Sequence, residues 1–172
     1  PFGYKYFMFA KLENGSDTLR AYLASEPDKL DPALNSTVDG AILAINAFAG
    51  LMTYDAEGKQ VNDLAENIEM TEDGLTYTVT LKDDLKWSNG DPLNANDFVY
   101  SWNRAANPLT ASDYGYMFAP IKGYTEMTEM DEEGNFVNPD AKLDVTASED
   151  GKTLTINLEY PCADFYEDRK ST

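Results

Sequence analysis

The chain has 172 residues, of which 42% are hydrophobic and 12% aromatic, so it can bury the core of one domain and is not expected to be disordered. Its formal net charge of −18 repels the phosphates of nucleic acids and anionic lipid headgroups, and neither is an expected partner. Because it has no histidine, a catalytic triad and a histidine-ligated metal site are excluded. The single cysteine, Cys162, cannot form a disulfide within the chain and is expected to be a small buried side chain.

The first elements predicted along the chain are two strands. Residues 1–10 are rich in aromatic side chains and apolar on both faces, which indicates a strand that is buried or paired on each side. Asn14-Gly15 is a turn signal, and residues 18–24 form a second strand pattern. We expect the two strands to pair in one sheet.

Two helices are predicted next. Ser36 is a candidate N-cap for a helix that extends to about Met52. Asn94 is the candidate cap of a second helix with Asp97 in its first turn, ended by Pro108. The apolar face of the second helix consists of Phe98, Val99, Trp102 and Ala106. Residues 112–118 suggest a further short helix, and residues 126–140 suggest a solvated acidic loop.

Two further segments share one pattern. Residues 71–81 (TEDGLTYTVTL) and 148–158 (SEDGKTLTINL) each place an Asp-Gly turn before an alternating strand, and they agree at six of eleven positions. Common hairpin chemistry or an internal duplication would produce this agreement, and the first is the favoured interpretation. The predicted fold class is α+β, with a mixed, mostly antiparallel sheet and a few packed helices.

Few residues suggest chemistry. The run Asp131-Glu132-Glu133-Gly134-Asn135 resembles a calcium loop, but an EF-hand needs glycine at position six and glutamate at position twelve. Here glycine is at position four and Lys142 at position twelve, which favours a solvated loop. The sequence also lacks a phosphate-binding glycine loop, a nucleophile elbow and zinc-ligand spacing, so we expect no cofactor, no metal and no enzymatic activity.

Residues 64–118 carry a more specific signal. The segment contains LKDDLKWSNGDPLNANDFVYSWNRAANPLTASDYGYMF, which resembles the signature region of the oligopeptide- and dipeptide-binding proteins of ABC importers, solute-binding family 5. Leu30-Asp31-Pro32 resembles the segment after the first strand of that family, and the resemblance extends over about residues 18–167. Trp87 and Trp102 within the signature are expected to be core residues.

The resemblance implies a fold and a domain division. It implies the small second lobe of a type II periplasmic-binding-protein fold together with strands of the first lobe. Family members are about three times longer than this chain. We therefore expect a fragment, truncated or engineered by rearrangement. In it, residues 1–17 would be a strand and linker grafted from the C-terminal end of the parent, residues 18–167 the N-terminal lobe fragment, and residues 168–172 a tail.

The resemblance also implies ligand-binding residues. In the family, the loop after the Leu-Asp-Pro segment and a tyrosine near the end of the signature contact the peptide; these correspond to Ser36, Thr37, Val38 and Tyr114. From the residues alone, Ser36 could equally be a helix cap and Tyr114 a packing residue. Relatives can carry an acidic residue at the position of Ser36.

Two functions follow as hypotheses. The first is a fragment of the extracytoplasmic, peptide-binding component of a bacterial ABC transporter, which in the intact parent is a lipid-anchored monomer that binds extended oligopeptides and contacts permease subunits. The alternative is an engineered or isolated folded lobe with no ligand of its own. A titration with peptides would discriminate between them.

Overall fold

The computed structural model describes residues 10–12, 19–21, 23, 25–138, 140–162 and 165. Its centre is a four-stranded antiparallel sheet in the order β5-β6-β8-β7. The strands are β5 (Ala65–Met70), β6 (Thr76–Leu81), β7 (Val145–Ala147) and β8 (Thr153–Asn157). Together with the helices this confirms the predicted α+β class with antiparallel pairing.

The two turns that precede β6 and β8 are built in the same way. Asp73 accepts a hydrogen bond from the hydroxyl of Thr71, and Asp150 accepts one from the hydroxyl of Ser148. Gly74 and Gly151 follow these aspartates, each with a φ of 70°, a left-handed conformation that glycine adopts without strain. Hairpin chemistry therefore accounts for the aspartate and the glycine that the two segments share.

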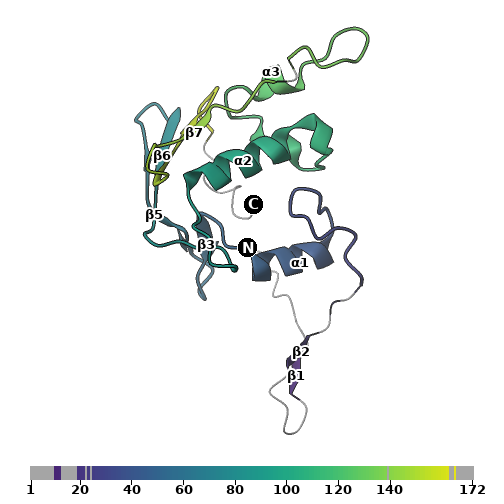
Figure 1. Cartoon of the computed structure of the whole chain (residues 1–172), viewed down its shortest axis with the longest axis vertical. Helices are drawn as coiled ribbons and strands as arrows, with labels where there is room; N and C mark the ends of the chain where they lie inside the picture. Colours follow the sequence, from purple (N-terminus) through teal and green to yellow (C-terminus); the bar gives the residue numbers. More distant parts are fainter. Residues whose placement is uncertain are drawn as a thin grey trace.

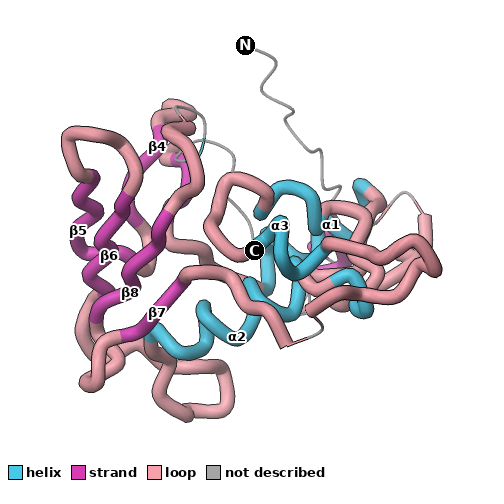
Figure 2. Tube along the Cα trace, turned by 90° about the horizontal axis from the view of Figure 1, so that it is seen from above, coloured by secondary structure: helices cyan, strands magenta, loops and turns pink. Residues whose placement is uncertain are grey.

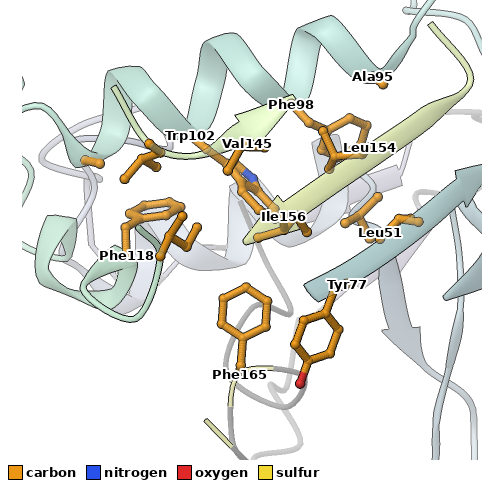
Figure 3. Close-up of a cluster of buried hydrophobic side chains, with 14 of the residues drawn as sticks. Leu51, Tyr77, Ala95, Phe98, Trp102, Phe118, Val145, Leu154, Ile156 and Phe165 are labelled. Atoms are coloured by element: carbon orange, nitrogen blue, oxygen red, sulfur yellow. The ribbon is translucent and has the colours of Figure 1, made fainter. Parts of the chain in front are cut away.

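The helix α2 (Ala95–Ala106) packs against one face of this sheet, as Figure 3 shows. Asn94 and Asp97 form a capping box at its start, which confirms the predicted cap. The helix ends at Ala106, before Pro108, as predicted. The buried side chains between helix and sheet include Phe98, Trp102, Leu154, Ile156, Val79 and Tyr77.

Three short helical segments follow or flank α2. The 3-10 helices are η1 (Pro108–Thr110) and η2 (Gly115–Phe118), and the second confirms the predicted turn of helix in residues 112–118. The helix α3 (Tyr124–Thr128) occupies the start of the region predicted as a loop. That prediction was wrong at this point because Met127, which is 3% exposed, packs into the core. Met130 then pairs with Phe136 around an acidic turn.

The helix α1 (Val38–Ala47) is shorter than predicted. Its N-cap is Thr37 and not Ser36, because the Thr37 hydroxyl accepts the amide hydrogen of Gly40 at 3.2 Å. It ends five residues before Met52 because Phe48 is extended and Met52 begins the strand β3 (Met52–Tyr54), which pairs with β4 (Gln60–Asn62).

The N-terminal strands form a separate two-stranded sheet. The strand β1 (Ala10–Leu12) pairs antiparallel with β2 (Leu19–Ala21). Of the predicted opening strand, 1–10, the structure describes Ala10, which pairs with Ala21 as predicted. Figure 1 shows this ribbon extending away from the four-stranded sheet. Residues 1–9 of the predicted opening strand and residues 168–172 of the predicted tail lie outside the described residues.

The two tryptophans differ in burial. Trp102 is 3% exposed, as predicted for a core residue, but Trp87 is 41% exposed, and the prediction that it lies in the core was wrong. Trp87 lies in a turn whose ends, Lys86 and Pro92, form a β-bridge, and residues 86–92 are all exposed. Cys162 is half-buried and packs against the core.

Candidate functional site

The first predicted ligand-binding segment is the loop that leads into α1. The side chain of Thr37 is engaged in the helix cap, and its hydroxyl also donates to the side-chain oxygen of Asn35 at 3.1 Å. Asn35 in turn donates to the Thr37 carbonyl at 3.1 Å, so these two residues fix the shape of the loop. Ser36 and Val38, on either side of Thr37, are exposed and present their side chains to solvent. Ser36 and Val38 are therefore the accessible side chains of this segment, while Thr37 supports the loop.

Tyr114 lies on a different segment, immediately before η2. Its side chain is 48% exposed, and its ring centroid lies 6.4 Å from that of Tyr116, with the rings inclined by 45°. Tyr116 is 63% exposed, so the pair forms an aromatic surface rather than part of the core. Because the Tyr114 side chain is about half exposed, the competing interpretation of Tyr114 as a packing residue is not favoured.

The structure connects both segments to the last turn of α2. Asp31 in the first segment accepts two hydrogen bonds from Arg104 of α2. In the second segment, Gly115 lies so close to α2 that a Cβ at this position would be 3.1 Å from the carbonyl oxygen of Ala105. Residues 104–106 are thus the common support of the two segments. Figure 2 shows α2 beside the four-stranded sheet and α1 farther from it.

Asp31 and Arg104 were missed as partners in the sequence. Asp31 Oδ1 lies 3.0 Å from Arg104 Nη1, and Asp31 Oδ2 contacts Nη2, so the guanidinium binds the carboxylate with both nitrogens. The hydrogen bond from Arg104 lowers the pKa of the Asp31 carboxyl below its ordinary value, and the backbone amide of Ala33 contributes in the same direction. The two positions are 73 residues apart, and no local pattern relates them.

We expect the Arg104→Gln variant to raise the pKa of Asp31, because it removes the strongest hydrogen bond to the ionised carboxylate. The ion pair contributes stability above the ordinary aspartate pKa of about 3.9 and loses it as the pH falls through the lowered pKa of the folded state. An NMR titration of the carboxyl carbons measures the change. Asp73 is the internal control, because its lowered pKa depends first on the Thr71 hydroxyl and should not respond.

Among the residues that the structure describes, no group of three or more cysteine or carboxylate side chains is arranged to hold a metal ion. The Asp131 carboxylate of the calcium-like run accepts hydrogen bonds from the amides of Glu133 and Asn135, at 2.9 and 2.8 Å, and thereby shapes its own turn. No described helix has the length and apolar character needed to span a bilayer.

Residues 59–169 match the bacterial extracellular solute-binding proteins, family 5. This is more than half of the chain, and the chain therefore belongs to that family. The family consists of solute-binding receptors and not of enzymes, in agreement with the prediction. Its extracellular description agrees with the predicted extracytoplasmic class.

Individual relatives give the same result. The chain is 43% identical over 111 residues to the dipeptide-binding protein of Lactococcus lactis, and 41% identical over 114 residues to the oligopeptide-binding protein OppA of Bacillus subtilis. These matches span 62% and 66% of the chain but only 20% and 21% of the relatives. The crystal structure of Haemophilus influenzae OppA in complex with the peptide RPPGFSPFR superposes with a TM-score of 0.73 and 30% identity, over 85% of this chain and 28% of that one. The chain thus spans about a fifth to a quarter of the length of these proteins.

Proposed function

We propose that the chain supplies part of the peptide-binding site of the extracytoplasmic receptor of a peptide ABC importer. The observation that carries the proposal is the arrangement around α2: two family segments, one with Ser36 and Val38 and one with Tyr114, are fastened to the same helical turn. Exposed side chains from two segments on one rigid support suit a ligand that lies between them. The named relatives bind dipeptides or oligopeptides, which supports an extended peptide as the ligand.

The proposal includes the context of the intact receptor. We infer a parent receptor that is a lipid-anchored monomer and delivers peptide to permease subunits. Residues 18–167 of this chain are a truncated or rearranged fragment of its N-terminal lobe. The helix α1 supports the view that further polypeptide covers this lobe. It is apolar in sequence (VDGAILAINA), yet Ile45, which is not one of the proposed ligand-binding residues, is 55% exposed. Helices that are apolar around their circumference are normally buried.

Isothermal titration with an equimolar pool of di- to pentapeptides tests the proposal. The chain is titrated alone and after it replaces the matching segment of full-length B. subtilis OppA. We expect weak or undetectable heat from the chain alone and saturable binding by the graft, because much of a peptide-enclosing site lies outside this chain. A correctly folded graft that binds no peptide would favour the alternative function, a folded lobe without a ligand of its own.

In the same graft, Tyr114→Ala is expected to weaken peptide binding about tenfold, as is typical of a contact tyrosine. The loss would reflect removal of the exposed ring that we assign to the ligand. Tyr160→Ala is the matched control, because Tyr160 is 49% exposed against 48% for Tyr114 but lies beyond the end of β8. Equal affinities of the two variants would remove Tyr114 from the site.

A further inference from the structure

Residues 29–47 form a loop followed by the helix α1, and part of their packing lies within the segment itself. Gly40 is the buried residue of α1, and the groups nearest to it belong to the same segment: a Cβ at Gly40 would lie 1.9 Å from Asn35 Oδ1 and 3.0 Å from the Lys29 carbonyl oxygen. The remaining residues of α1 are half-buried or exposed. The connections of this segment to the rest of the protein include the contact of Ala33 with the core and the pair of Asp31 with Arg104.

One of these connections is the pair formed by Asp31 and Arg104. Asp31 shapes its own loop, since its carboxylate accepts the amide of Ala33 and its carbonyl accepts the amides of Leu34 and Asn35, each at 3.0 Å. The same carboxylate accepts hydrogen bonds from both terminal nitrogens of the Arg104 guanidinium, Nη1 and Nη2. A bidentate pair restrains direction as well as distance, because two parallel N–H···O bonds hold the guanidinium and the carboxylate close to one plane.

Arg104 lies on the turn of α2 that also contacts the segment carrying Tyr114. It lies in the last turn of α2, and its neighbours Ala105 and Ala106 are 5% and 3% exposed. Gly115, next to Tyr114, approaches the carbonyl of Ala105. The carboxylate of Asp31 therefore orients one predicted ligand-binding segment on the same turn that carries the other.

We propose that the Asp31–Arg104 pair is a positioning clamp that sets the loop of Ser36 and Val38 relative to Tyr114. The inference rests on the proposed function for the identity of the contacting residues. The clamp residues themselves are assigned no ligand contact. They act by holding the loop in the geometry that a peptide needs, so that the loop loses less conformational entropy when the peptide binds.

Amide hydrogen exchange of the full chain tests the clamp without any peptide. We expect Asp31→Asn, Arg104→Gln and the double variant each to speed exchange in residues 33–47 about tenfold, while β6 and β8 remain protected. Because the two side chains form one interaction, the double variant should exchange no faster than the single variants. Lys152→Gln is the control, since it breaks the exposed pair of Lys152 and Asp83 elsewhere on the surface. Unchanged exchange in residues 33–47 would overturn the clamp.

The second test of the clamp measures the affinity of the OppA graft for the pool of di- to pentapeptides. Arg104→Gln should weaken binding about fivefold to tenfold with Ser36, Val38 and Tyr114 all intact. Faster exchange with unchanged affinity would refute the role of the clamp in binding. If the parent graft binds no peptide, the proposed function fails, and the exchange data alone decide whether the pair fastens the loop.

Discussion

Trp102→Ala is expected to lower the free energy of unfolding by about 3–5 kcal/mol, the range for truncating a large aromatic side chain in a core. Trp102 is 3% exposed and lies between α2 and the sheet, with its ring centroid 5.9 Å from that of Phe118. A small apolar cavity of about 30 Å³ adjoins it and is also lined by Tyr77, Ile156 and Phe165. Truncation would enlarge a space that is already incompletely filled, and the rigid helix and sheet on either side limit its collapse.

Urea unfolding monitored by circular dichroism measures this loss. Tyr100→Ala is the matched control, because Tyr100 lies on the same helix but is 71% exposed, and it should change the free energy by less than about 0.5 kcal/mol. A loss below about 1 kcal/mol for Trp102→Ala would mean that the buried face of α2 is not as the structure places it.

The sequence predicted α2 well because its determinants are local. Asn94 and Asp97 satisfy amide hydrogens within the first turn, and Phe98 and Trp102 are four residues apart on one face. The turns before β6 and β8 were predictable for the same reason, since each aspartate binds amides within a few residues of itself. None of these features depends on the rest of the fold.

Predictions that depended on distant parts of the chain were less accurate. Trp87 has the residue type of a core anchor, but its burial depends on whether another element covers the turn that carries it, and it is 41% exposed. Ser36 and Thr37 are both good cap residues. Asn35 selects Thr37, because the Asn35 side-chain oxygen accepts a hydrogen bond from the Thr37 backbone amide at 3.2 Å. Composition does not distinguish such alternatives.

The candidate site was predicted through resemblance rather than through physical pattern. Ser36, Thr37, Val38 and Tyr114 were named from the family, and the structure adds that Thr37 is engaged in a cap while the other three are exposed. The link between their segments could not be inferred, because Asp31 and Arg104 are 73 positions apart. Only the fold brings this aspartate to the end of α2.

Gly123→Ala is expected to lower the free energy of unfolding by roughly 3 kcal/mol, through two effects at one position. Gly123 has a φ of 88°, a conformation that costs a residue with a Cβ about 1–2 kcal/mol. In addition, the new Cβ would lie 2.1 Å from the carbonyl oxygen of Lys142, so the two backbone segments must separate. That movement would strain the neighbouring hydrogen bonds from Lys122 to Asn157 and from Asp144 to Lys122, at 3.0 and 2.7 Å.

Gly58→Ala separates the two effects in the same unfolding experiment. Gly58 has a φ of 78°, yet nothing lies within 4 Å of the Cβ that it would gain, so its substitution should cost only the conformational part, about 1–2 kcal/mol. The difference between the two variants then measures the close approach of residue 123 to Lys142. This approach joins the segment that carries Tyr114 to the end of β8 and the start of β7, because Lys122 donates to Asn157 of β8 and accepts from Asp144, which precedes β7. If Gly123→Ala proves no more harmful than Gly58→Ala, the backbones do not meet there, and the sheet does not hold the Tyr114 segment at this point.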